Sequence, residues 1–109
     1  MVPIHPQQRF FLEIILQAAD LTLHARDDVE DPLHDALTAT GLGEVTGAGS
    51  GLGVSNIDIE VTDLHAGLAL IRRVLRELKV APSTVIYLHE GDHSKGTGRV
   101  TAYPVYQQP

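Results

Sequence analysis

The sequence contains no cysteine, and no apolar run in it approaches the length of about 20 residues that a membrane-spanning helix requires. Without cysteine the chain has no disulfide bond, thiol nucleophile or cysteine-ligated metal site, which is typical of a reducing compartment, so we expect a cytoplasmic location. The most apolar stretch, residues 10–16, is short, contains Glu13 and is not followed by a small-residue cleavage site. It is therefore not expected to be a signal peptide.

Basic residues are also few. Eight Lys and Arg stand against 14 Asp and Glu, which gives a formal net charge of −6. Binding to nucleic acid depends on basic side chains that contact phosphates, so this balance argues against a nucleic-acid partner. An acidic surface instead suits a basic protein partner. No nucleotide or other cofactor motif is present, and we predict no cofactor.

The apolar pattern predicts a single α+β domain over residues 1–109, with flexible tails at 1–8 and 104–109. Residues 56–63 alternate between apolar and polar side chains, which is typical of a half-buried strand, whereas residues 64–79 repeat leucine and isoleucine at helical spacing. Pro32 and acidic residues indicate the start of an earlier helix, and Gly41 indicates its end. We expect strands near 9–18, 43–49, 55–62 and 83–90, helices near 28–40 and 64–79, and an additional C-terminal edge strand that ends at Pro104.

The predicted order over residues 9–90 is strand, helix, strand, strand, helix, strand. This order resembles the ferredoxin-like βαββαβ sandwich, in which two helices cover one face of an antiparallel sheet. The chain is also similar in size and acidity to small bacterial immunity-type and regulatory modules. The fold resemblance implies an uncovered sheet face but implies no particular activity.

Residues 43–61 contain glycine at positions 47, 49, 51 and 53. A dinucleotide-binding loop needs the spacing G-x-G-x-x-G and a following helix, but Leu52 and Val54 stand where the third glycine is required and a strand follows. We therefore predict a β-hairpin whose glycines supply positive φ angles and leave one strand face bare.

Residues 89–93 match the zinc-protease pattern H-E-x-x-H. That pattern requires a helix that places both imidazoles on one face, whereas residues 85–93 read as a strand that ends in a loop. His89 and Glu90 would then point to opposite faces of the sheet. A metal site at His89 and His93, serving a small hydrolase or isomerase, is retained as the alternative function. No G-x-S-x-G nucleophile motif is present.

Charges of opposite sign gather on the two predicted helices. Acidic residues crowd into positions 27–35, and basic residues into positions 72–79. Adjacent helices on one sheet face would let these charges pair, with each exposed pair contributing at most about 1 kcal/mol. We expect solvated helix faces here rather than an RNA-binding surface.

The uncovered face of the predicted sheet combines apolar side chains with carboxylates. We interpret it as the binding surface of a non-enzymatic module, for example an immunity or regulatory protein that masks a basic partner. A homodimer through the same face is the other possibility for the partner. The residues expected to form this surface are Phe11, Glu13, Ile15, Asp58, Glu60, Tyr87 and His89.

Overall fold

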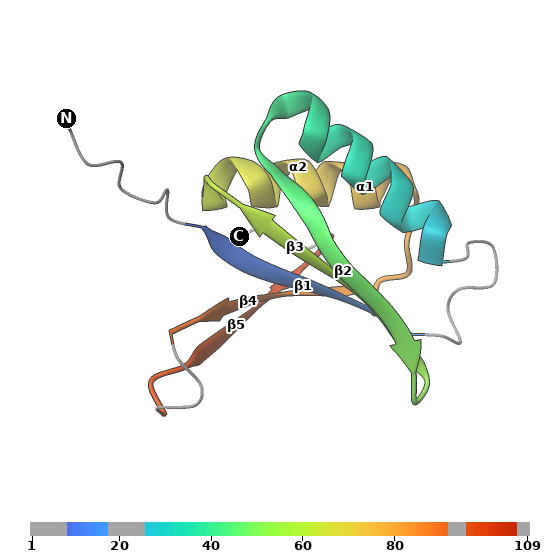
Figure 1. The fold of residues 1–109 in the computed structure, drawn as a ribbon. Coiled ribbons are helices and arrows are strands. Elements are labelled where there is room, and N and C mark those ends of the chain that lie inside the picture. The colour runs from blue at the N-terminus through green and yellow to red at the C-terminus, as the bar shows by residue number, and fades with distance from the viewer. Residues whose placement is uncertain (1–8, 18–25, 92–95, 107–109) are drawn as a thin grey trace.

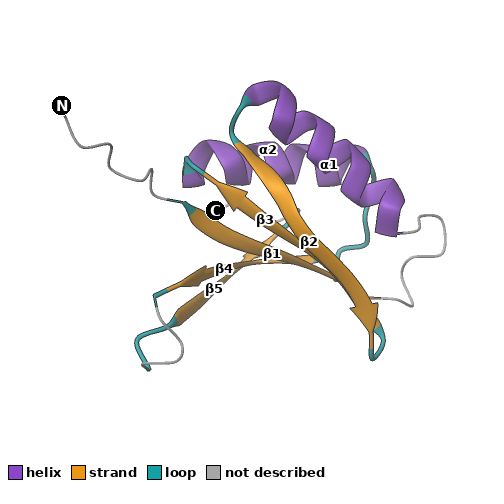
Figure 2. Cartoon of the chain, in the orientation of Figure 1, coloured by secondary structure: helices purple, strands orange, loops and turns teal. Residues whose placement is uncertain are grey.

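The computed structural model describes residues 9–17, 26–91 and 96–106. The chain forms five strands and two helices, drawn in Figures 1 and 2. Neither helix in the described part of the chain combines the length and the apolar character that a bilayer crossing demands. In chain order the elements are β1 (Phe10–Gln17), α1 (Arg26–Thr40), β2 (Gly43–Gly51), β3 (Val54–Val61), α2 (Leu64–Glu77), β4 (Val85–Glu90) and β5 (Arg99–Pro104).

The strands form one antiparallel sheet in the order β2-β3-β1-β4-β5. Both helices lie on the same face of this sheet (Figure 1). The predicted α+β class, the antiparallel sheet and the extra edge strand are therefore confirmed. The connection from β1 to β2 contains α1, and the connection from β3 to β4 contains α2. Because both connections cross the same face of the sheet, these helices leave the opposite face of the central strands uncovered.

The core lies between the helices and the sheet. Alternate residues of β1, Leu12, Ile14 and Leu16, are almost completely buried, and β3 contributes Ile57, Ile59 and Val61 in the same way. The helices add further apolar side chains to this layer, namely Val29, Leu33, Leu37, Leu68, Leu70, Ile71, Val74 and Leu75. Burial of such side chains contributes about 1.5–3 kcal/mol each and is the main stabilising term of the fold.

The second helix follows its sequence signals closely. The carboxylate of Asp63 accepts a hydrogen bond of 2.9 Å from the backbone N–H of Ala66, as expected of an N-cap. Gly67 faces β3, where an added Cβ would lie 2.8 Å from the Val61 side chain. Glycine at this position lets α2 approach the sheet more closely than a larger residue would. Lys79 then takes a positive φ of 57° just after the helix.

The first helix differs from the prediction at its N-terminus. It begins at Arg26, before the expected residue 28, so Pro32 lies inside the helix. Proline has no N–H to donate to the carbonyl four residues earlier, which here is that of residue 28. Because residue 28 lies near the start of the helix, the missing bond affects only the first turns. Gly41, with φ of 69°, ends the helix as predicted.

Residues 104–106, at the end of β5 and just after it, pack beside α2. The Nε–H groups of Arg72 and Arg76 donate to the backbone carbonyls of Pro104 and Val105 at 2.9 and 2.8 Å. Tyr106 donates its hydroxyl to the carbonyl of Val80. Residues 104–106, which the sequence assigned to a tail, thus pack on α2, with Val105 only 1% exposed. The remaining predicted tail residues, 1–8 and 107–109, lie outside the described residues.

The basic residues of α2 also have partners that the sequence did not predict. Arg72 and Arg76 use their Nε–H groups on the C-terminal segment, and Arg73 pairs with Glu77 of its own helix at 3.8 Å. Backbone carbonyls can accept these bonds because the C-terminal segment runs beside α2. The sequence pattern contains no signal for that contact.

The glycine-rich stretch forms the predicted hairpin, but of its four glycines only Gly53 takes the positive φ that was expected of them. β2 and β3 pair with Gly51 opposite Val54, and Leu52 and Gly53 form the two-residue turn with φ of 53° and 81°. Positive φ at both turn residues matches the right-handed twist of the strands, although it is unusual for leucine. The Leu52 side chain is fully exposed at the tip. A strand follows the glycines, so no helix N-terminus is available there for a phosphate.

Two glycines of β2 differ in the space around them, which gives a test of the packing. A Cβ on Gly43 would lie 2.2 Å from the Glu60 carbonyl oxygen, whereas a Cβ on Gly51 would meet nothing within 4 Å. We predict that Gly43→Ala lowers the free energy of unfolding by about 1–3 kcal/mol, because backbone must move. Gly51→Ala should change it by less than about 0.5 kcal/mol. Urea denaturation of both variants measures the difference, and equal effects would contradict the described packing of β2 on β3.

Candidate functional site

The sheet face that neither helix of the described residues covers, here called the open face, carries every residue that the sequence assigned to a partner surface. All of these side chains are partly exposed. The strand register sets them in rows across β3, β1 and β4. One row is Glu60, Phe11 and His89, the next is Asp58, Glu13 and Tyr87, and the third is Asn56, Ile15 and Val85.

His89 is held by its neighbours on the open face. Its Nε2 lies 3.0 Å from Oε1 of Glu13, and its ring is 5.3 Å from the ring of Phe11 at an angle of 43°. Both partners of the Glu13–His89 contact are about a quarter exposed, at 28% and 26%. Glu13 and His89 belong to adjacent strands and are offset by one row, so the bond runs diagonally across the sheet.

Two carboxylates oppose each other in the middle of the open face. Glu13 of β1 and Asp58 of β3 are direct partners in the antiparallel register. Like charges directly opposite each other destabilise a sheet. His89 shares a hydrogen bond with Glu13, and Asn56 donates from Nδ2 to Oδ1 of Asp58 at 3.1 Å. The centre of the face is therefore a site where an incoming cation is favoured.

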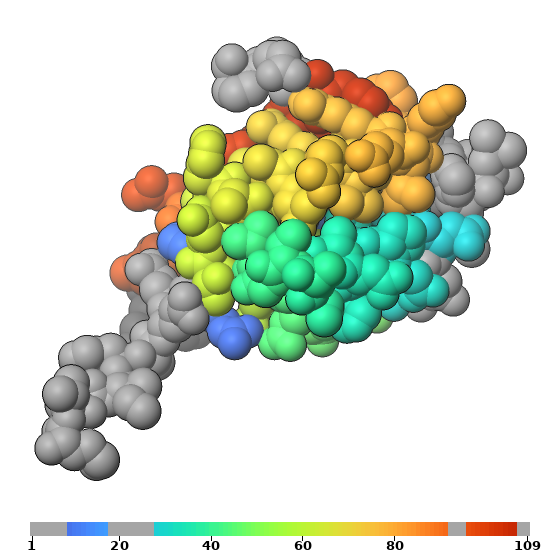
Figure 3. Space-filling view, turned by 90° about the horizontal axis from the view of Figure 1, so that it is seen from above, coloured from blue at the N-terminus to red at the C-terminus, as the bar shows by residue number. Residues whose placement is uncertain are grey.

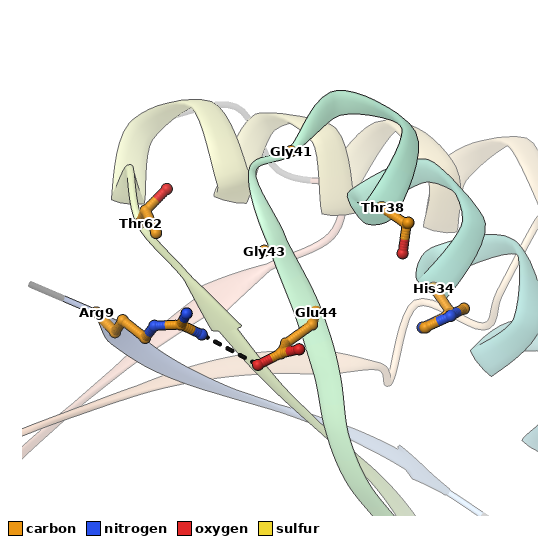
Figure 4. A pocket seen from close by; sticks show the side chains of 7 residues that line it. All are labelled: Arg9, His34, Thr38, Gly41, Gly43, Glu44 and Thr62. Carbon is orange, nitrogen blue, oxygen red and sulfur yellow. Dashed lines mark hydrogen bonds and ion pairs between the residues drawn. The ribbon is translucent and has the colours of Figure 1, made fainter. Parts of the chain in front are cut away.

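Arg9 contributes to one corner of the open face, and the sequence did not indicate it. Its Nη1 lies 3.1 Å from Oε1 of Glu44 (Figure 4). The same nitrogen lies 3.6 Å from Oε2 of Glu60. Glu44 and Glu60 are cross-strand partners, so the guanidinium reduces the repulsion between them. Only the strand register brings these two carboxylates together, and a single sequence does not specify it.

The glycines of β2 also lie on the open face. Beyond a register shift between Val45 and Gly47, Gly47 pairs with Asp58 and Gly49 pairs with Asn56. A Cβ on Gly47 would lie 3.4 Å from Oδ2 of Asp58, and one on Gly49 would lie 3.1 Å from Oδ1 of Asn56. The first distance is an ordinary contact, whereas the second is tight and would require the Asn56 side chain to shift. The two glycines thus leave the β2 backbone bare beside the polar side chains of β3.

The open face is mainly apolar on β4 and β5. Val100 and Ala102 of β5 pair with His89 and Tyr87 of β4 and continue the rows outward. Val100 is one of the most exposed large apolar side chains, at 47%. The face therefore divides into a mainly apolar half on β4 and β5 and an acidic half on β3 and β2, with Phe11, Glu13 and Ile15 of β1 between them. The sequence prediction missed the contribution of β5 because it left the pairing partner of that strand open.

The zinc-protease pattern does not form a helix. His89 and Glu90 are consecutive residues of β4, so they point to opposite faces as predicted, and Gly91 follows with φ of 77°. His93 lies outside the described residues. Within residues 9–17, 26–91 and 96–106, no three His, Asp or Glu side chains come together as a metal site would require.

A polar cavity of about 500 Å³ adjoins the corner of the open face where Arg9 meets Glu44 (Figure 4). Its lining side chains come from Arg9, from α1 and from the neighbouring ends of β2 and β3. Arg9 and Glu44 bind each other there, while His34 and Thr38 are contributed by the exposed surface of α1. The carboxylate and the guanidinium of the cavity are thus paired with each other, an arrangement that does not indicate nucleophilic catalysis.

A scan against protein-family models found no match, and searches of the curated proteins and of the solved structures found none either. Function must therefore be inferred from the residues of the open face.

The contact between Glu13 and His89 can be measured directly. In a double-mutant cycle of Glu13→Ala and His89→Ala, we predict a coupling free energy of about 0.5–1.5 kcal/mol, the range of a partly buried hydrogen bond. The exposed pair Arg73 and Glu77 is the matched control and should give at most about 0.5 kcal/mol. Chemical denaturation supplies the free energies. A coupling of zero between Glu13 and His89 would show that His89 is not held by Glu13.

Proposed function

We propose that this protein is a non-enzymatic binding module whose open face binds a basic protein partner. The observation that carries the proposal is the direct opposition of Glu13 and Asp58 beside Phe11, Ile15 and Tyr87, on a sheet face that neither described helix covers. The apolar side chains favour removal from water on association. The two carboxylates can be desolvated favourably only if the partner supplies cations to pair with them.

The same charges argue for a different protein as partner and against a second copy of this chain. A face-to-face homodimer would bring a second set of Glu13, Asp58, Glu44 and Glu60 toward the first. In the described part of the chain, the guanidinium of Arg9 pairs with Glu44 and Glu60, and His89 shares a hydrogen bond with Glu13. A lysine or arginine from a basic partner would instead meet Glu13 and Asp58 with opposite charge.

The strand order supports the finer description of the fold. Without β5, the order β2-β3-β1-β4 is the one expected for a ferredoxin-like βαββαβ sandwich. Within that proposal, the chain is an intracellular immunity or regulatory module that masks a basic protein such as a nuclease. The strand conformation of His89 and Glu90 weighs against the alternative of a metal-dependent hydrolase at His89 and His93, because the zinc-protease pattern requires a helix.

A photo-crosslinking residue in place of Tyr87 tests this proposal. We predict a covalent adduct with a second, basic protein in cells that produce this chain naturally, because Tyr87 lies in the centre of the open face. The matched control carries the same photo-crosslinking residue in place of Ala39, which is exposed on α1, and should give no such adduct.

Charge reversal identifies the interaction that holds the partner. Asp58→Lys should abolish the Tyr87 adduct, whereas Asp31→Lys, an equal charge change on the exposed surface of α1, should preserve it. An adduct of this chain with itself would show that the open face forms a homodimer and does not bind a basic partner. An adduct that survives Asp58→Lys would contradict the role of the central carboxylates, and one zinc ion per purified chain would favour the hydrolase.

A further inference from the structure

A groove lies on the helical side of the molecule, away from the open face, between the N-terminal half of α2 and strand β5. Figure 3 shows α2 between α1 and the C-terminal strand. The groove encloses about 520 Å³, a volume within the usual range for small-molecule sites of about 300–1,000 Å³. Its lining residues are Leu64, His65, Leu68, Ala69, Arg72 and Tyr103.

The groove is apolar along its length. Leu64, Leu68 and Arg72 follow each other at intervals of one helical turn, which sets a length of about 12 Å at 1.5 Å per residue. Leu64 is partly buried and Leu68 is 9% exposed, and Tyr103 forms the side that belongs to β5. Ala69 is exposed and has too small a side chain to fill the groove.

Residues 104–106 leave this half of α2 uncovered. From Tyr103 the chain continues past Arg72 and Arg76, which bind the carbonyls of Pro104 and Val105, to Val80, which accepts the Tyr106 hydroxyl. It therefore runs toward the C-terminal end of α2, away from Leu64. The groove therefore lies beside the N-terminal half of α2, which residues 104–106 do not cover.

Arg72 ends the groove with a positioned positive charge. Its Cζ lies 5.7 Å from the centroid of the Tyr103 ring, and its Nε–H donates to the Pro104 carbonyl at 2.9 Å. These contacts use the face of the guanidinium and its Nε–H, so the Nη groups remain able to donate to a ligand. Arg76 lies one turn further along the same helix. Positive charge is therefore concentrated here on a chain whose formal net charge is −6.

We propose that the groove binds a linear amphipathic carboxylate, with the carboxylate on the Nη groups of Arg72 and the hydrocarbon chain over Leu64, Leu68 and Tyr103. A guanidinium pairs with a carboxylate through two parallel hydrogen bonds, which gives this end its preference for an anion. An extended eight-carbon carboxylate fits within the distance of about 12 Å that separates Leu64 from Arg72 along the helix. This site is separate from the open face and from the protein partner proposed for it.

Binding of octanoate, with octanol as the uncharged control, tests the proposal by NMR titration of the full chain. Octanoate should shift the amide signals of Leu64–Arg72 and Tyr103, and octanol should bind at least about tenfold more weakly because it lacks the anion. Arg72→Gln should weaken octanoate binding by about tenfold or more, a loss of about 1.4 kcal/mol. Arg73→Gln removes the same charge from the adjacent exposed position and should leave the affinity within about twofold.

Arg72→Gln also removes a hydrogen bond to β5, so a second variant separates binding from folding. Ala69→Phe fills the groove from an exposed position and should abolish octanoate binding while the remaining amide signals stay unchanged. Equal affinity for octanol and octanoate, equal losses in Arg72→Gln and Arg73→Gln, or no shifts at millimolar octanoate would each overturn the proposal. Self-association that Ala69→Phe abolishes would assign the groove to a second copy of the chain.

Discussion

The position of β1 between β3 and β4 is the constraint on which the rest of the structure depends. Leu12, Ile14 and Leu16 of this strand are buried under the helices, while Phe11, Glu13 and Ile15 alternate with them and face the other way. Since both helices return over the first side, the second side is left partly exposed. The open face is thus a direct consequence of the core, because side chains of one strand alternate between the two faces.

The polar groups on the open face are arranged in local pairs rather than as a uniform acidic surface. Arg9 binds the carboxylates of Glu44 and Glu60, and His89 binds Glu13. Asp58 accepts from Asn56 and lies opposite Glu13, beside the bare backbone of Gly47. Neighbouring carboxylates of this kind favour an approaching cation. The apolar half on β4 and β5 adds contact area that a partner can bury without any charge pairing.

The features that the sequence predicted are those with a local pattern. Alternation at Ile57 and Ile59 predicts a strand, leucines at helical spacing predict α2, and Asp63 and Gly41 mark helix ends, all within a few residues. The features that it missed depend on which strands become neighbours. Arg9 between Glu44 and Glu60, and Val100 beside His89, follow from the register of distant segments. The groove at Arg72 likewise exists only because β5 lies beside α2.

Carboxylate labelling with a carbodiimide, in the purified chain and in its complex recovered from the producing cells, measures most directly whether the open face is buried by a partner. Glu13 and Asp58 lie on the open face, whereas Asp31 and Asp35 are exposed on α1 and serve as internal references. If a basic partner covers the open face, labelling of Glu13 and Asp58 decreases in the complex and labelling of Asp31 and Asp35 does not change. Protection of Asp31 and Asp35 with unchanged labelling of Glu13 and Asp58 would contradict the proposed function.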